Sequence, residues 1–132
     1  MKKIQLQKYN DVRGNLTFFQ NNDQIPFKIE RTYWIYDVPG GESREGHAFK
    51  EGEEFIVAIS GSFDVIIKKG NKDETHKLTR PYAGIYLPPL TWRTIKNFST
   101  NAVALIVSSR KYSSKDYIRN YETFKKISLE KC

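Results

Sequence analysis

The chain has 132 residues, enough to bury a core in one domain and too few for two, so we expect residues 1–132 to form a single domain. Its 22 Lys and Arg against 15 Asp and Glu give a formal net charge of +7, which favours an anionic partner such as a nucleic acid, a membrane surface or a phosphorylated metabolite without choosing among them. No apolar run is long enough for a transmembrane helix, and the N-terminal MKKIQLQKYNDVRG lacks the apolar core of a signal peptide, so we expect a soluble cytoplasmic protein. The lone cysteine, Cys132, receives no role.

Short apolar, β-branched and aromatic runs recur along the chain and are broken by Gly, Pro, Asn and Asp. This pattern is typical of an all-β sandwich or barrel, and we expect a jelly roll. The first two strands should form an extended N-terminal arm, and the turn Lys69-Gly70-Asn71 should close a hairpin. The expected strands cover residues 4–9, 15–20, 27–36, 55–60, 62–68, 74–78, 84–87, 91–95 and 102–108.

The C-terminal segment has a different texture. Residues 113–116, Ser-Ser-Lys-Asp, offer a helix N-cap. Tyr117, Ile118, Tyr121 and Phe124 then fall at helical spacing, so we expect one short C-terminal helix.

The stretch Gly41–Gly61 keeps the spacing of the first cupin motif, in which glycine, histidine, glutamate and glycine recur at fixed intervals. A metal cupin carries a second histidine two residues after the first, because alternate residues of a strand point to one side and two imidazoles can then share an ion; here that residue is Phe49. The last histidine of such a site falls within PPLTWRTIKN, where this chain has Arg93. Only His47 and Glu54 remain as ligands, whereas a catalytic metal normally needs three protein groups. We therefore expect a cupin pocket without a metal.

Three segments together resemble the nucleotide-sugar 3,4-ketoisomerases: HAFKEGEEFIVAISGSFDVII, RPYAGIYLPPLTWRTIKNFS and KYSSKDYIRNYETFKK. The resemblance spans nearly the whole chain. It implies a metal-free cupin jelly roll that forms a homodimer with exchanged N-terminal strands. It also implies an isomerase that moves the keto group of TDP-4-oxo-6-deoxy-D-glucose from C4 to C3 through an enediol without a cofactor. The product of that family feeds the synthesis of 3-amino-3,6-dideoxyhexoses for lipopolysaccharide and other glycans.

Moving a ketone from C4 to C3 requires a base that titrates near neutral pH, a proton donor, and positive or hydrogen-bonding groups around the enediolate oxygens. His47 is one of two histidines and matches the base proposed for the family. A lone strand histidine is more often a satisfied polar residue, and it is the surrounding motif that reverses this preference. His76 follows a charged turn and is expected to be structural.

Many family members carry a second histidine where this chain has Phe49, so the role of that histidine must move elsewhere or be dispensable. A tyrosine can protonate an enediolate if nearby cations lower its pKa, which makes Tyr33 and Tyr36 candidates, beside an ordered water. Packing is the alternative for both tyrosines. Arg93 and Arg13 stand at positions associated in the family with an axial or equatorial C4 oxygen. Their combination here mixes two patterns and leaves the product open between galacto and gluco, with galacto preferred.

The candidate substrate-binding residues are mainly arginines, because a planar guanidinium can hold a diphosphate or sugar hydroxyls with two donors. Arg31 shares a strand face with Tyr33, and Arg44 lies in the loop before His47; surface solvation is the alternative for both. Trp92 is expected to wall the sugar or stack on thymine, with core packing as the alternative. Glu54 is expected to form hydrogen bonds within the pocket.

Four other functions compete with the isomerase. A nucleotide-sugar 3,5-epimerase also uses a cupin barrel, but it pairs its histidine with an aspartate, and none follows His47 before Asp64. A non-catalytic sugar-nucleotide-binding cupin would explain the missing second histidine as a decayed site. A metal-dependent cupin oxygenase lacks ligands, and nucleic-acid binding rests on the net charge alone, without an RNA-binding motif or a recognition helix.

Overall fold

The computed structural model describes residues 1–131, including all their side chains except those of residues 45, 130 and 131. Cys132 lies outside the described residues. The strands are β1 (Lys2–Gln5), β2 (Arg31–Ile35), β3 (Arg44–Phe49), β4 (Glu54–Ser60), β5 (Phe63–Lys69), β6 (Lys72–Leu78), β7 (Ala83–Leu87), β8 (Arg93–Lys96), β9 (Val103–Ser108) and β10 (Tyr117–Ile118). The helical elements are a 3-10 turn, η1 (Ser114–Asp116), and α1 (Tyr121–Lys131).

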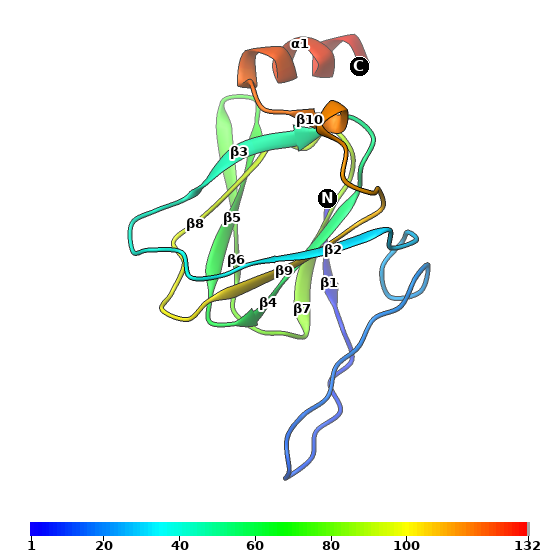
Figure 1. Cartoon of the computed structure of the whole chain (residues 1–132), viewed down its shortest axis with the longest axis vertical. Coiled ribbons are helices and arrows are strands. Elements are labelled where there is room, and N and C mark those ends of the chain that lie inside the picture. The colour runs from blue at the N-terminus through cyan, green and yellow to red at the C-terminus, as the bar shows by residue number, and fades with distance from the viewer. Residues whose placement is uncertain (132) are drawn as a thin grey trace.

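Two antiparallel five-stranded sheets form the body of the protein, which confirms the expected jelly roll. Their strand orders are β1-β7-β4-β9-β2 and β10-β3-β8-β5-β6. Figure 1 shows the two sheets as opposite walls, with α1 lying across one end. On β5 the buried side chains alternate with partly exposed ones, as one face of a half-buried strand requires. The buried residues that fill the space between the sheets are Ile56, Ala58, Phe63, Val65, Ile67, Leu78, Ile85, Leu87, Ile95, Ala104 and Ile106.

Local sequence signals account for two features of this frame. The β5–β6 hairpin closes through a two-residue turn, because Lys69 pairs with Lys72 and Gly70 takes a φ of +61°, a left-handed conformation that glycine adopts without strain. On β2 the side chains of Arg31 and Tyr33 are half-buried, while Trp34 is exposed, as the alternation in the sequence predicts. Arg31 and Tyr33 therefore share the face of β2 that points into the barrel.

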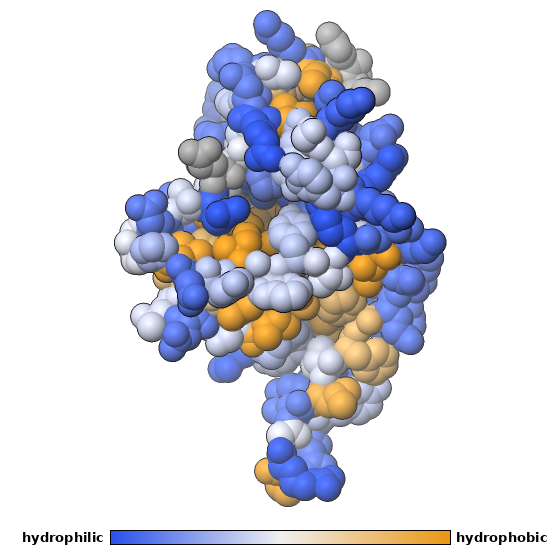
Figure 2. Space-filling model, in the orientation of Figure 1, coloured by the Kyte–Doolittle hydropathy of each residue, from blue (hydrophilic) through white to orange (hydrophobic). Residues whose placement is uncertain are grey.

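The N-terminal arm differs from the expectation. β1 covers Lys2–Gln5 and pairs with β7, but the strand predicted over 15–20 is absent from the described structure apart from a single bridge between Tyr9 and Leu16. The arm extends away from the body (Figure 1), and among residues 1–131 its backbone after β1 forms strand pairs only within the arm, at this bridge. The side chains of Tyr9, Val12, Leu16 and Phe18 stay exposed, and Figure 2 shows apolar surface on the arm.

The C-terminal segment also differs from the expectation. Tyr117 and Ile118 form the short strand β10, which pairs with β3, instead of beginning a helix. The N-cap predicted within residues 113–116 is wrong for α1, because the side-chain oxygen of Asn120 accepts a hydrogen bond from the Thr123 backbone N–H at 2.9 Å. Within residues 1–131, α1 is the one α-helix, and it is too short and polar to cross a membrane. The cytoplasmic location stays a prediction.

Candidate active site

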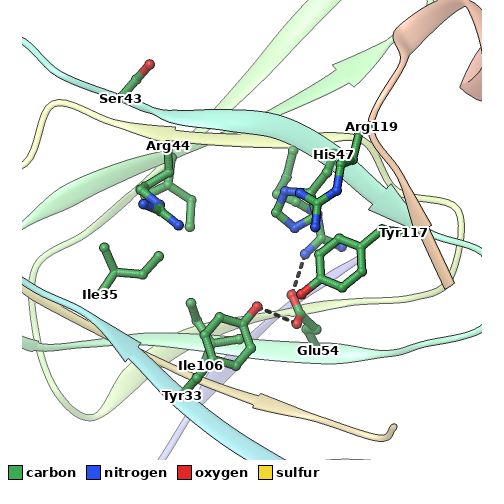
Figure 3. Close-up of a pocket in the computed structure, with 11 residues that line it drawn as sticks. Tyr33, Ile35, Ser43, Arg44, His47, Glu54, Ile106, Tyr117 and Arg119 are labelled. Atoms are coloured by element: carbon green, nitrogen blue, oxygen red, sulfur yellow. Dashed lines mark hydrogen bonds and ion pairs between the residues drawn. The ribbon is translucent and has the colours of Figure 1, made fainter. Parts of the chain in front are cut away.

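A cavity of about 350 Å³ lies between the two sheets (Figure 3). One wall comes from the first sheet and carries Tyr33 and Ile35 of β2, Glu54 of β4 and Ile106 of β9. The other comes from the second sheet and carries Arg44 and His47 of β3, Arg93 and Ile95 of β8, and Tyr117 of β10, with Ser43 and Arg119 beside them.

Glu54 is the centre of a buried network at the base of this cavity. Its carboxylate accepts a hydrogen bond from the Tyr33 hydroxyl at 2.6 Å and another from Arg93 Nη1 at 2.5 Å. Arg31 Nη2 lies 3.8 Å from the same carboxylate. Arg93 Nε donates to the Thr91 carbonyl at 3.2 Å, whereas Arg93 Nη2 is buried and has no partner among the described residues. The network thus holds Arg93 firmly and leaves one of its donors for a ligand.

The Tyr33 hydroxyl belongs to this network, which changes the role expected for it. Burial raises the pKa of Tyr33 above its ordinary value, and the Glu54 carboxylate raises it further, while Arg93 opposes this more weakly. The expectation that nearby cations lower the pKa of Tyr33 is therefore wrong. Tyr33 instead stays protonated and donates its hydrogen bond to Glu54, fixing the carboxylate that holds Arg93.

A bulge in β3 brings Arg44 and His47 to the same side. Arg44 pairs with Ile95 and His47 with Arg93, so β3 uses one residue more than β8 over this stretch. Residues three apart on a regular strand point to opposite faces, and the extra residue turns both side chains toward the cavity. Gly46 lies in the bulge, where an added Cβ would approach the Trp92 indole nitrogen to 2.6 Å, so the glycine permits this close packing.

His47 stands on an aromatic part of the wall. Its ring centre lies 5.1 Å from that of Phe49 in an edge-on arrangement and 5.5 Å from that of Tyr117. Arg93 is its cross-strand neighbour on β8, and the Arg93 guanidinium lies 5.1 Å from the Phe49 ring centre. Phe49 therefore fills the position of a second histidine with an apolar ring against a buried cation.

Comparison with known proteins places the chain in a family. Residues 1–128 match the family described as FdtA: WxcM-like, C-terminal. The chain belongs to this family.

Individual relatives of this FdtA-family member cover almost its full length. It is 40% identical to TDP-4-oxo-6-deoxy-alpha-D-glucose-3,4-oxoisomerase of Aneurinibacillus thermoaerophilus, over 98% of this chain and 96% of that protein. Its structure matches the QdtA 3,4-ketoisomerase of Thermoanaerobacterium thermosaccharolyticum in complex with TDP with a TM-score of 0.95 and 29% identity, covering 98% and 95% of the two chains. A histidine-to-asparagine variant of that enzyme was solved with TDP-4-keto-6-deoxyglucose. The WlaRB TDP-quinovose 3,4-ketoisomerase of Campylobacter jejuni matches with a TM-score of 0.89 and 38% identity, covering 95% and 96%.

Four of the expected site residues do not line the cavity in this FdtA-family chain. Arg31 lies beside it, with its guanidinium 3.8 Å from the Glu54 carboxylate. Tyr36 is 60% exposed and lines a separate shallow hollow, which leaves it apart from His47. Trp92 is buried in a cluster with Phe124 of α1, so it packs the helix onto the sheet, as the packing alternative supposed. Arg13 lies exposed in the N-terminal arm, paired with Asp11 at 2.9 Å.

Two residues of the cavity were missed because their segment was interpreted as helix. Tyr117 lies opposite Phe49 in the β10–β3 pair, and its ring packs on Phe49 with centres 4.5 Å apart. Arg119, two residues later, also lines the cavity, with its guanidinium 4.2 Å from the Tyr117 ring centre. The alternation Tyr117-x-Arg119 is the strand signal that could have identified them.

Among the described residues, neither the site residues predicted from the sequence nor the two found only in the structure form a metal site. Among the described side chains, no group of three or more His, Cys, Asp and Glu lies close enough to share an ion. Glu54 is already bonded to Tyr33 and Arg93, which leaves its carboxylate little capacity for a cation. The metal-free, cofactor-free site stays a prediction.

Proposed function

We propose that the protein is a TDP-4-oxo-6-deoxy-D-glucose 3,4-ketoisomerase. The observation that carries this proposal is the pairing of His47, a base, with Arg93, a buried cation with an uncommitted donor, directly across β3 and β8. Such a pair suits proton abstraction beside a ketone, because the base removes the proton while the cation stabilises the oxygen that becomes negative. The relatives at 29 to 40% identity that carry this activity support the assignment.

In the proposed reaction His47 removes the proton from C3 of the sugar, and the electron pair forms the C3–C4 double bond of an enediolate. Arg93 Nη2 donates to the developing negative oxygen. Because Glu54, Tyr33 and the Thr91 carbonyl fix the guanidinium beforehand, little reorganisation is needed when charge develops. Protonation at C4 and transfer of the proton on O3 to O4 complete the isomerisation.

The TDP group is held at the rim of the cavity. Arg44 on one side and Arg119 on the other line the cavity with guanidiniums (Figure 3), and a diphosphate carries the charge that such forks bind. Arg31 contacts residues of the pocket wall, since its guanidinium lies beside Glu54 and over the Tyr33 ring. We assign it to the support of the pocket and assign the phosphates to Arg44 and Arg119.

We further propose a homodimer with exchanged N-terminal strands. The arm carries Tyr9, Leu16 and Phe18, which are between 42% and 59% exposed, and another copy of the chain would cover them. The exchange would also bring Arg13 of the partner subunit to a substrate, which Arg13 does not do within its own chain.

Subunit complementation tests this arrangement. We would co-express Arg13→Ala and His47→Asn chains under two affinity tags and purify the mixed dimer. If Arg13 acts across the dimer, one of the two sites carries both wild-type residues and the mixed dimer keeps about half of the wild-type activity. If both residues act within one chain, every site is damaged and no activity returns. A monomer in solution, or full activity of Arg13→Ala alone, would remove this part of the proposal.

The product is proposed to be TDP-3-oxo-6-deoxyhexose, galacto in preference to gluco, for the synthesis of 3-amino-3,6-dideoxyhexoses. A 3,5-epimerase would instead exchange protons at C3 and C5 and leave the ketone at C4. A non-catalytic binding module would hold the sugar nucleotide without exchange.

One experiment separates these functions: a proton NMR time course of TDP-4-oxo-6-deoxyglucose with the protein in deuterated buffer. Deuterium in the ring together with a new 3-keto species is expected, and both should be lost in His47→Asn. His76→Asn is the matched control, because His76 lies on β6 outside the cavity and pairs with Glu74. Exchange at C3 and C5 without a 3-keto species would indicate the epimerase, and binding without exchange would indicate the non-catalytic module.

A further inference from the structure

Phe49 occupies the position of the second histidine, so this chain lacks that acid. The fold places a tyrosine next to the same position. On a sheet face, residues directly opposite each other on adjacent strands have neighbouring side chains. Tyr117 on β10 lies directly opposite Phe49 on β3. The Tyr117 ring packs against both Phe49, at 4.5 Å, and His47, at 5.5 Å between ring centres. A phenol thus lies next to the base, at the place where the second histidine is missing.

The Tyr117 hydroxyl is directed into the cavity. Figure 3 shows the ring reaching from β10 toward Glu54 and Tyr33, with its oxygen leading. Tyr117 also contributes to the raised pKa of Tyr33, which requires that the two phenols be near each other. The Tyr117 ring packs against His47, Phe49 and Tyr112, and the guanidiniums of Arg31 and Arg119 lie over its face.

The other tyrosines considered for proton transfer are committed or remote. The Tyr33 hydroxyl donates to Glu54 at 2.6 Å, and its proton holds the carboxylate in place. Tyr36 is exposed and lies outside the cavity. We propose that Tyr117 is the catalytic acid that delivers the proton to C4 of the enediolate, in place of the second histidine. This inference rests on the proposed isomerase activity.

The proton balance is as follows. His47 takes the proton from C3, and the former C4 carbonyl oxygen becomes negative. The proton on O3 moves to O4, so that the electron pair on O3 can form the new C3 carbonyl while C4 takes a proton from the Tyr117 hydroxyl. The resulting phenolate regains a proton from the His47 imidazolium, directly or through one water, across the adjacent rings. No oxidant or other reactant is consumed.

The position of Tyr117 also predicts the product. His47 and Tyr117 come from neighbouring strands of one sheet, so the base and the acid approach the sugar from the same wall. In a gluco ring the hydrogens on C3 and C4 point to opposite faces. Removing a proton from C3 and adding one to C4 on the same face therefore gives the galacto configuration, with the C4 oxygen axial.

The experiment compares wild type with Tyr117→Phe, which keeps the ring contacts and removes the hydroxyl alone. The NMR assay in deuterated buffer measures two quantities separately: the exchange of the C3 proton, which needs His47, and the formation of the 3-keto product, which also needs the acid. We expect product formation to fall by roughly 100-fold or more while C3 exchange continues at close to the wild-type rate. Tyr112→Phe is the matched control, because Tyr112 packs on Tyr117 but does not line the cavity.

Three outcomes would overturn the inference. Wild-type product formation by Tyr117→Phe would mean that the hydroxyl is not needed. Equal loss of exchange and product, with an unchanged melting temperature, would make Tyr117 a residue that positions His47. A gluco product from the wild-type protein in ordinary water would exclude delivery from the same face. In each case the 3-keto product of the wild-type protein would still establish the isomerase, so the two proposals fail separately.

Discussion

Arg93 Nη1 and Glu54 Oε1 lie 2.5 Å apart between β8 and β4, with both side chains only 1% exposed. This pair joins the two sheets at the base of the cavity. It therefore serves the fold and the proposed chemistry together, because the same contact neutralises a buried charge and holds the cation that faces the substrate.

Replacing Glu54 by Gln should be strongly destabilising. The substitution keeps the size of the side chain but leaves the Arg93 charge buried without its counterion, and breaking such a pair costs about 3–5 kcal/mol. Urea unfolding measures the change in the free energy of unfolding. Glu51→Gln is the control: its ion pair with Arg110 is exposed, and its loss should cost less than about 1 kcal/mol. Equal effects of the two substitutions would contradict the importance given to the buried pair.

Tyr33→Phe should change the way in which stability depends on alkaline pH. The folded-state pKa of Tyr33 is raised by burial and by Glu54, so the folded state keeps this proton at a pH where an unfolded tyrosine, with a pKa of about 10, has lost it. The stabilisation from Tyr33 is therefore complete below pH of about 10 and declines as the pH rises above it. Melting temperatures of wild type and Tyr33→Phe should differ most at pH 7–9 and converge toward pH 11. A melting-temperature difference that grows as the pH rises would contradict a raised pKa of Tyr33 in the folded state.

Trp92→Ala should affect stability more than substrate binding. The indole is 6% exposed and packs against Tyr121 and Phe124, so its removal leaves a cavity and costs about 3–5 kcal/mol. At a temperature where the variant is folded, the KM for the TDP sugar should stay close to the wild-type value. Leu129→Ala on the exposed side of α1 is the control and should change stability by about 0.5 kcal/mol or less. A raised KM with unchanged stability would instead indicate that Trp92 contacts the substrate.

Arg44→Gln should weaken substrate binding and leave the chemical step intact. A hydrogen bond to a charged group contributes about 1.5–3 kcal/mol, which corresponds to roughly a 10- to 100-fold rise in KM. The kcat at saturating substrate should change little, because Arg44 lies on the side of Ser43 and Ile35 and away from Glu54 in Figure 3. Arg80→Gln, which lies outside the cavity, is the control. A fall in kcat with constant KM would assign Arg44 to the reaction instead.

The jelly roll, the β5–β6 hairpin and the inward face of β2 could be predicted because they depend on local alternation and turn residues. Motif spacing predicted His47, Glu54 and Arg93 in one pocket, and all three line the cavity. Arg44 also lines it, but it begins β3 and does not lie in a loop as expected. Tyr117 could not be placed, since its strand conformation depends on pairing with β3, which lies about seventy residues earlier in the sequence. Its aromatic spacing suits a helix equally well, and the contact between distant segments decides between the two.

Tyr33 illustrates a second limit. Its direction follows from alternation on β2, but the effect on its pKa depends on whether a carboxylate or a guanidinium is nearer to its oxygen. The sequence predicts both Glu54 and Arg93 in the same pocket as Tyr33. Only the three-dimensional arrangement shows that the Glu54 carboxylate accepts the hydrogen bond of the Tyr33 hydroxyl. The pKa of a buried group therefore cannot be predicted from which charged residues surround it.

The bulge between Arg44 and His47 has a consequence for how sequences of this kind should be compared. Residues two apart on a regular strand point to the same face, so a relative that lacks one residue here still directs its counterparts of Arg44 and His47 to the same side of the sheet. A single gap at this position in an alignment thus removes the bulge without separating the base from the arginine that is proposed to hold the diphosphate.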